Sequence, residues 1–257
     1  MFASIEWAGR PVRVEYGWVG AKAGPVLVFL HEGLGSLTMW RDFPERLAAA
    51  LGMRGLVYSR PGYGKSTPRA AAERWGVDFM HRQAREVLPA VLDAAGASAA
   101  PVWIYGHSDG GSIALLYAAE FPERVAGLIV AAPHVFVEDV SIASIERART
   151  AYRDTDLRAK LARHHDDPDS AFRGWNDIWL DPAFRSWTIE REIAPISCPV
   201  LALQGVDDEY GTMEQIRRIG RAVPGTELLE IGQCGHSPHR DQPDAVIRAA
   251  VRFAGSR

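Results

Sequence analysis

Three groups of residues in this 257-residue chain have the types and spacing that nucleophilic catalysis needs. Gly106–Gly111 (GHSDGG) sets Ser108 between two glycines, directly after an apolar run and before a helical pattern. A serine on so sharp a turn needs neighbours without Cβ atoms, and it needs a base to remove its proton. Farther along lie the acidic group Asp207–Glu209 and then His236. The order nucleophile, acid, histidine predicts a catalytic triad that begins at Ser108.

These residues follow short apolar runs that alternate with longer amphipathic segments, a pattern typical of βαβ units around a mostly parallel sheet. The predicted strands are Val12–Tyr16, Val26–Leu30, Gly55–Tyr58, Val102–Tyr105, Leu128–Ala132, Val200–Gln204 and Glu227–Ile231. The predicted helices are Trp40–Leu51, Met80–Ala95, Gly110–Glu120, Met213–Val223 and Asp244–Phe253. The three candidate groups lie just beyond strand ends, so we expect them at one edge of an α/β fold.

One stretch, residues 134–195, interrupts the alternation. It has no convincing strand, carries many charges and contains three tryptophans. A helical insertion of this kind would lie over the carboxyl ends of the strands, where open α/β sheets bind ligands. We therefore predict a core formed by residues 1–133 and 196–257, with residues 134–195 as a small helical cap.

With these motifs in place, the chain resembles the α/β-hydrolase superfamily over nearly its whole length outside the predicted cap. His31–Ser36 (HEGLGS) is similar to the family's H-G-x loop, and Arg60–Ser66 (RPGYGKS) is similar to its G-x-G-x-S turn. The resemblance selects Asp208 over Asp207 as the acid of the triad, and it makes His236 the base. It also implies the α/β-hydrolase fold.

The resemblance further implies an oxyanion hole formed by the backbone N–H groups of Gly33 and Asp109. Glu32 stands where the family usually has glycine, so two acidic side chains flank the predicted hole. Asp109 in the first turn of a helix would interact favourably with the helix dipole. The alternative hypothesis is that Glu32 and Asp109 share a proton, as close carboxylates can, and so tune the hole.

The substrate pocket has candidate residues in Glu32, His134, Trp175 and Trp179. His134 follows a predicted strand end and either faces the pocket or packs at the surface. Trp175, Trp179 and Trp187 recur at separations that share one helix face, although Pro182 interrupts a helix there. They form either the core of the cap or an aromatic wall for an apolar substrate.

Two other motifs do not predict a cofactor. Gly64-Lys65-Ser66 resembles the end of a P-loop, but Ser59 stands where its first glycine belongs. The segment His164–Asp167 looks like a set of metal ligands, but adjacent residues rarely converge on one ion, and Pro168 suggests a solvated loop. We expect no metal and no organic cofactor.

The composition excludes several classes of partner. The 29 Lys and Arg nearly balance the 32 Asp and Glu, so the chain has no charge footprint for nucleic acid or an anionic membrane surface. No apolar run approaches the ~20 residues of a membrane span. The N-terminal residues lack a secretory signal, and two cysteines, Cys198 and Cys234, fit a reducing compartment. We expect a cytoplasmic protein with a small-molecule substrate, and the oligomeric state stays open.

Together these features predict a serine hydrolase that cleaves a small to medium carboxylic ester or lactone through an acyl-enzyme. One alternative is a carbon-carbon bond hydrolase acting on ring-fission diketones, which would turn over simple aryl esters poorly. The other, from a different class, is a non-catalytic small-molecule receptor of the same fold.

Overall fold

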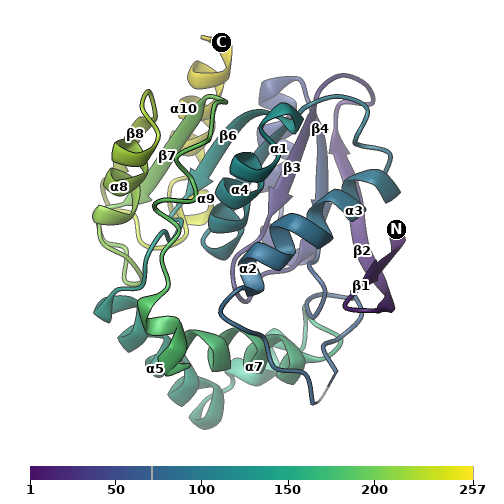
Figure 1. The fold of residues 1–257 in the computed structure, drawn as a ribbon, viewed down its shortest axis with the longest axis vertical. Helices are drawn as coiled ribbons and strands as arrows, with labels where there is room; N and C mark the ends of the chain where they lie inside the picture. The colour runs from purple at the N-terminus through teal and green to yellow at the C-terminus, as the bar shows by residue number, and fades with distance from the viewer. Residues whose placement is uncertain (71, 257) are drawn as a thin grey trace.

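A central sheet of eight strands dominates the computed structural model, which describes residues 1–70 and 72–256 (Figure 1). The strands are β1 (Phe2–Trp7), β2 (Arg10–Gly20), β3 (Val26–Leu30), β4 (Arg54–Tyr58), β5 (Val102–His107), β6 (Val125–Ala131), β7 (Val200–Gly205) and β8 (Glu227–Ile231). Their order in the sheet is β1-β2-β4-β3-β5-β6-β7-β8. Strand β2 pairs antiparallel with β1 and β4, and all other pairs are parallel. The predicted mostly parallel sheet is confirmed.

The burial of the strands explains which of them the sequence revealed. All six residues of β5 are buried, because helices cover both faces of the central strands, and such strands read as continuous apolar runs. Strand β1, which the prediction missed, buries Ala3, Ile5 and Trp7 and exposes the residues between them. Its alternation is short and half polar, so it gave a much weaker signal than β5.

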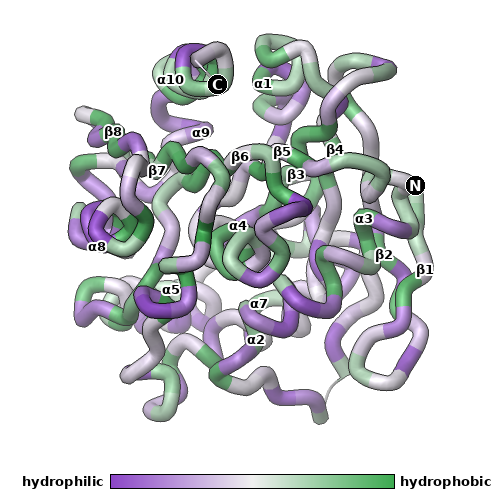
Figure 2. The backbone as a smooth tube through the Cα atoms, turned by 45° about the horizontal axis from the view of Figure 1, so that its top comes forward, coloured by the Kyte–Doolittle hydropathy of each residue, from purple (hydrophilic) through white to green (hydrophobic). Residues whose placement is uncertain are grey.

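Helices cover the two faces of the sheet as separate layers (Figure 2). On one face lie α1 (Phe43–Leu51) and α10 (Pro243–Gly255). On the other lie α2 (Phe79–Arg82), α3 (Leu88–Ala94), α4 (Asp109–Glu120) and α8 (Glu214–Ala222).

Two predicted helices differ in detail from those in the structure. The predicted helix Trp40–Leu51 begins only at Phe43, after a 3₁₀ turn over Leu37–Trp40. The predicted helix Met80–Ala95 contains a π turn at Gln83–Val87, just before Pro89. A proline lacks the N–H that continues an α-helical ladder, and a wider turn is one way to accommodate it.

Between Ala131, at the end of β6, and Val200, at the start of β7, the chain leaves the sheet as an inserted segment. It contains α5 (Asp139–Asp154), α6 (Leu157–Leu161), α7 (Pro168–Trp179) and a 3₁₀ turn at Pro182–Ser186. An isolated bridge from Phe136 to Thr188 joins its two ends. Helices α5 and α7 lie together at one end of the sheet (Figure 1). Among the described residues, no helix is long and apolar enough to span a membrane.

Candidate active site

Ser108 occupies a strained turn between β5 and α4. Its φ of 53° and ψ of −122° belong to a region that side-chain-bearing residues rarely adopt. A Cβ atom on Gly106 would lie 2.4 Å from the Gly110 carbonyl oxygen, and one on Gly110 would lie 2.1 Å from the Leu30 oxygen. The two glycines around Ser108 therefore allow α4 to pack directly against the ends of β5 and β3.

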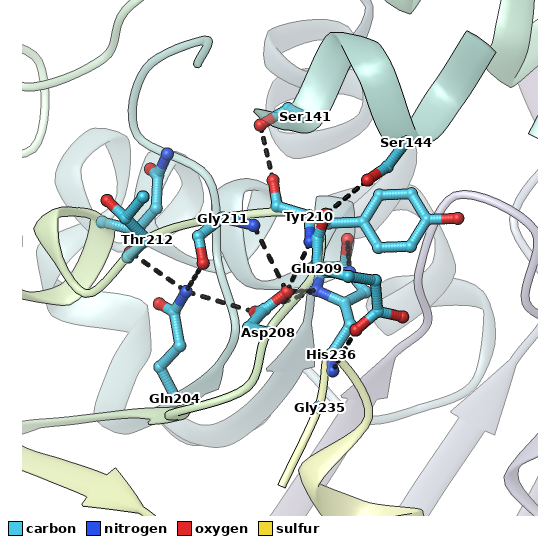
Figure 3. A network of polar contacts seen from close by, with 12 residues as sticks. Ser141, Ser144, Gln204, Asp208, Glu209, Tyr210, Gly211, Thr212, Gly235 and His236 are labelled. Carbon is cyan, nitrogen blue, oxygen red and sulfur yellow. Dashed lines mark hydrogen bonds and ion pairs between the residues drawn. The ribbon is translucent and has the colours of Figure 1, made fainter. Parts of the chain in front are cut away.

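A hydrogen-bonded chain connects Ser108, His236 and Asp208. The Ser108 Oγ lies 2.9 Å from His236 Nε2. On the other side of the ring, His236 Nδ1 lies 2.9 Å and 3.1 Å from the two Asp208 oxygens (Figure 3). The carboxylate can only accept, so Nδ1 carries the proton and Nε2 is free to accept the serine proton. This arrangement can activate the hydroxyl for attack on a carbonyl.

Asp208 is fixed by further donors on its own loop. Its Oδ1 accepts from the N–H groups of Tyr210 (2.8 Å) and Gly211 (3.2 Å), and its Oδ2 accepts from Gln204 Nε2 at 3.1 Å. Ser141 and Ser144 of α5 donate to the Tyr210 and Glu209 carbonyls (Figure 3). The inserted segment therefore holds the loop that carries the acid.

Burial and neighbouring charges shift the pKa values of Asp208 and His236 in opposite directions. Burial raises the pKa of Asp208, but His236 and the backbone N–H donors outweigh burial, and the pKa falls below its ordinary value. Burial lowers the pKa of His236, but Asp208, Glu209 and Glu32 outweigh burial, and the pKa rises. The imidazolium that forms when His236 takes a proton is thus stabilised.

The loop after β3 holds one peptide group in a fixed orientation. The Glu32 carbonyl accepts from His31 Nδ1 (2.7 Å), an Arg60 guanidinium N–H (2.8 Å) and the Gly35 N–H (3.1 Å). In a trans peptide the next N–H points the opposite way, so these donors orient the N–H of Gly33. No hydrogen bond among the described residues uses the N–H of Gly33 or Asp109.

The two carboxylates beside these N–H groups do not share a proton. The Asp109 Oδ1 accepts from Trp179 Nε1 at 3.2 Å, and its Oδ2 lies 3.8 Å from the Arg60 guanidinium. The Glu32 carboxylate instead lies 3.4 Å from His107 Nδ1. The hypothesis that Glu32 and Asp109 share a proton is therefore wrong, because each has a different partner.

His107 joins Glu32 to the loop that carries the base. Its Nε2 lies 2.6 Å from the His236 carbonyl oxygen, which can only accept, so Nε2 carries a proton. Its other ring nitrogen, Nδ1, lies 3.4 Å from a Glu32 carboxylate oxygen. Burial raises the pKa of Glu32, but the hydrogen bond from His107 and the nearby histidines lower it well below its usual range. The pair therefore connects the end of β5 to the loops after β3 and β8.

The pH dependence of kcat/KM is expected to report these charges. The base works only when neutral, so kcat/KM should rise with pH through the pKa of His236, which lies above its ordinary value of 6.5. Glu32→Gln removes a negative charge that favours the imidazolium, so the acid limb should move to lower pH. Glu123→Gln, an exposed residue on Pro122–Arg124, is the control for a distant charge. An acid limb that stays in place in Glu32→Gln, or moves to higher pH, would contradict this assignment.

A cavity of about 160 Å³ opens over Ser108. All four candidate pocket residues line it. The full lining comprises Glu32, Gly33, Leu34, His107, Ser108, His134, Ile145, Trp175, Trp179, Glu209, Tyr210, His236 and Ser237. Trp187 does not line it and stacks on Phe184, with ring centroids 5.1 Å apart. All three tryptophans are therefore buried in the core, and two of them, Trp175 and Trp179, also line the cavity.

The segment His164–Asp167 is a loop, as the sequence suggested, and Asp166 is exposed, but His165 is buried. His165 is only 4% exposed, accepts from the Gly64 N–H at 2.9 Å and contacts the Leu34 carbonyl through its other nitrogen. It therefore attaches the inserted segment to the loops after β3 and β4. Within residues 1–70 and 72–256, no group of three His, Cys, Asp or Glu side chains could hold a metal ion.

Arg60 has the largest predicted effect on stability. It is fully buried, and its guanidinium lies between the Asp109 carboxylate, the Glu32 carbonyl and the Tyr63 ring. Arg60→Met should lower the free energy of unfolding by about 3 kcal/mol or more, because Asp109 is left buried without a counter-charge. Urea denaturation measures this loss. Adding Asp109→Asn should recover part of it, and a double variant no more stable than Arg60→Met would rule out the ion pair as the cause.

Comparisons with known proteins identify the family of this chain. A sequence model of the alpha/beta hydrolase family matches residues 27–249. A 2-hydroxy-6-oxononadienedioate/2-hydroxy-6-oxononatrienedioate hydrolase from Burkholderia vietnamiensis is 26% identical, over 98% of this chain and 94% of its own. The enol-lactonase from Burkholderia xenovorans superposes with a TM-score of 0.74 at 18% identity, over 99% of this chain and 100% of its own. An esterase from Thermogutta terrifontis superposes with a TM-score of 0.73 at 18% identity, over 100% and 98% of the two chains. The chain belongs to the alpha/beta hydrolase family.

Proposed function

We propose that this chain is a serine hydrolase that cleaves a small carboxylic ester or lactone through an acyl-enzyme intermediate. The observation that carries the proposal is the hydrogen bond of 2.9 Å from Ser108 Oγ to His236 Nε2, with Asp208 on the other ring nitrogen. Family membership supports a hydrolase. The charge and the volume of the cavity support an ester or lactone as the substrate.

In the proposed reaction, Ser108 Oγ attacks the carbonyl carbon while His236 Nε2 takes the hydroxyl proton. The carbonyl oxygen becomes an oxyanion, which the N–H groups of Gly33 and Asp109 stabilise. His236 returns the proton to the leaving alcohol, or to the ring oxygen of a lactone, and the acyl-enzyme forms. A water molecule that gives its proton to His236 then attacks the ester, releasing the acid and restoring Ser108.

The charge of the cavity favours an ester or lactone over ring-fission substrates that carry two carboxylates. The Burkholderia vietnamiensis relative is named for dienedioates, which carry two carboxylates. Two glutamates, Glu32 and Glu209, line the cavity here, and none of its described lining residues is Lys or Arg. A dianion would lie against like charge without a cation to bind it. A cavity of about 160 Å³ also suits a small acyl group.

Labelling with a fluorophosphonate tests the proposal directly, because the probe reacts with serines that a base activates beside an oxyanion hole. We expect rapid modification at Ser108, mapped by mass spectrometry, and its loss in His236→Ala. Hydrolysis of short aryl esters should accompany the labelling. A folded wild-type protein that does not label would overturn the proposal, and ligand screening by thermal shift would then test the receptor alternative.

A further inference from the structure

His134 presents an unused hydrogen-bonding ring at the wall of the cavity. It follows β6, lines the cavity over Ser108 and is 3% exposed. Its Nδ1 is buried without a hydrogen-bond partner, and no hydrogen bond among the described residues involves Nε2. Nδ1 is closed off from solvent, so Nε2 is the ring nitrogen that a ligand in the cavity can reach. A ligand oxygen there can supply the hydrogen-bond partner that Nε2 lacks.

The surroundings of His134 hold the ring in place. Its backbone N–H donates to Ser112 Oγ at 3.1 Å, and Ser112 donates to the His134 carbonyl at 2.6 Å. The ring packs edge-on against Trp179, with centroids 4.9 Å apart, and lies 5.7 Å from the ring of His236. His134 is therefore positioned next to the group that transfers the proton.

The ring is neutral, so it can both donate and accept. Burial, and then the nearby His236, lower the pKa of His134 to about 3. A neutral imidazole has one N–H donor and one acceptor nitrogen. It matches a hydroxyl, ether or carbonyl oxygen better than an ion, and the glutamates in the cavity wall oppose an anion.

We infer that His134 is a specificity-determining residue, which binds an uncharged oxygen substituent of the substrate close to the scissile carbonyl. The substrate class is then an ester or lactone with a hydroxyl, alkoxy or oxo group near the reacting carbon, rather than a plain alkyl ester. The inference rests on the proposed hydrolase function and deepens it, because it concerns substrate choice at the same site.

Matched ester pairs test this subsite. On the acyl side, para-nitrophenyl methoxyacetate and butanoate differ by one ether oxygen in place of a methylene. On the alcohol side, hydroxyethyl and propyl butanoate differ by one hydroxyl in place of a methyl group. For each pair we divide kcat/KM of the polar ester by kcat/KM of the apolar ester. This ratio is compared between wild type, His134→Phe and His134→Asn, so the intrinsic reactivity of each ester cancels.

We expect His134→Phe to lower this ratio by about tenfold or more for at least one pair, the size expected for a lost hydrogen bond in a buried site. His134→Asn keeps a donor and an acceptor near the ring position and should restore most of the ratio. If the phenylalanine variant does not fold, His134→Leu replaces it. The half-ester para-nitrophenyl succinate tests charge, and faster turnover of it than of both neutral acyl esters would overturn the requirement for an uncharged group.

The outcomes separate this inference from the function on which it rests. Ratios that are equal in wild type and His134→Phe for both pairs, in a protein that labels at Ser108, overturn the subsite and leave the hydrolase intact. A wild-type protein that does not label at Ser108 overturns both. If the ratio falls in His134→Phe and His134→Asn does not restore it, hydrogen bonding by His134 is also contradicted. The shape of the side chain would then explain the preference for the polar ester.

Discussion

Ser108→Ala is expected to lower kcat/KM for short esters by a factor of about 10⁶, the size seen when a serine nucleophile is removed from a working triad. The alanine keeps the turn, the glycines around it and the two backbone N–H groups, but it has no oxygen to attack the carbonyl. Steady-state hydrolysis and active-site labelling measure the loss. Retention of more than a small residual rate would show that another residue is the nucleophile.

Ser108→Gly separates the chemical role of the residue from its strain. Both variants should be inactive, but glycine adopts a φ of 53° with a ψ of −122° without the clash that a Cβ atom causes. We expect Ser108→Gly to have a free energy of unfolding about 1 kcal/mol higher than Ser108→Ala, offset in part by the entropy of glycine in the unfolded chain. Urea denaturation of the two variants gives this difference. A glycine variant that is less stable than the alanine variant would contradict strain at this turn.

The features that could be predicted from the sequence are those that follow a general rule of protein structure. Buried parallel strands such as β5 read as apolar runs, and the glycines beside Ser108 mark a turn that tolerates no Cβ atoms. Because parallel strands end at one edge of a sheet, three groups far apart in the chain could be assigned to one site from their positions after strands. Strand β1 escaped because it is short and half exposed.

The contacts that position the site could not be predicted in the same way. Arg60 and His107 lie inside the RPGYGKS and GHSDGG motifs, where a charged or titratable side chain was a usable signal. Their partners are Asp109, at the start of α4, and the His236 carbonyl, on the loop after β8, so only the fold brings them together. The shared proton between Glu32 and Asp109 failed for the same reason, since proximity to a common site does not determine which side chains meet. Gln204 and Tyr210 gave no local signal at all.

Asp208→Asn is expected to lower kcat by about 10⁴ while leaving the fold intact. The Asp208 Oδ1 accepts from two backbone N–H groups and Oδ2 accepts from Gln204 alone, so the oxygen of an amide at this position is favoured at Oδ1, although its NH₂ then faces the Gln204 Nε2 donor. Its oxygen would take the place of Oδ1, which accepts from the Tyr210 and Gly211 N–H groups. Its NH₂ would then stand at Oδ2, beside His236 Nδ1.

An amide N–H in that place favours the imidazole tautomer with the proton on Nε2, since Nδ1 must now accept. The ring then presents a proton, rather than a lone pair, to Ser108 Oγ, and it cannot act as the base. Asp207→Asn is the matched control, because Asp207 is the adjacent, exposed carboxylate whose backbone N–H contacts the Cys234 carbonyl. Steady-state kinetics measure both variants. A larger loss of kcat in Asp207→Asn than in Asp208→Asn would make Asp207 the acid of the triad. A larger loss in Asp208→Asn, which we expect, would show that the rate depends on the tautomer that Asp208 imposes on His236.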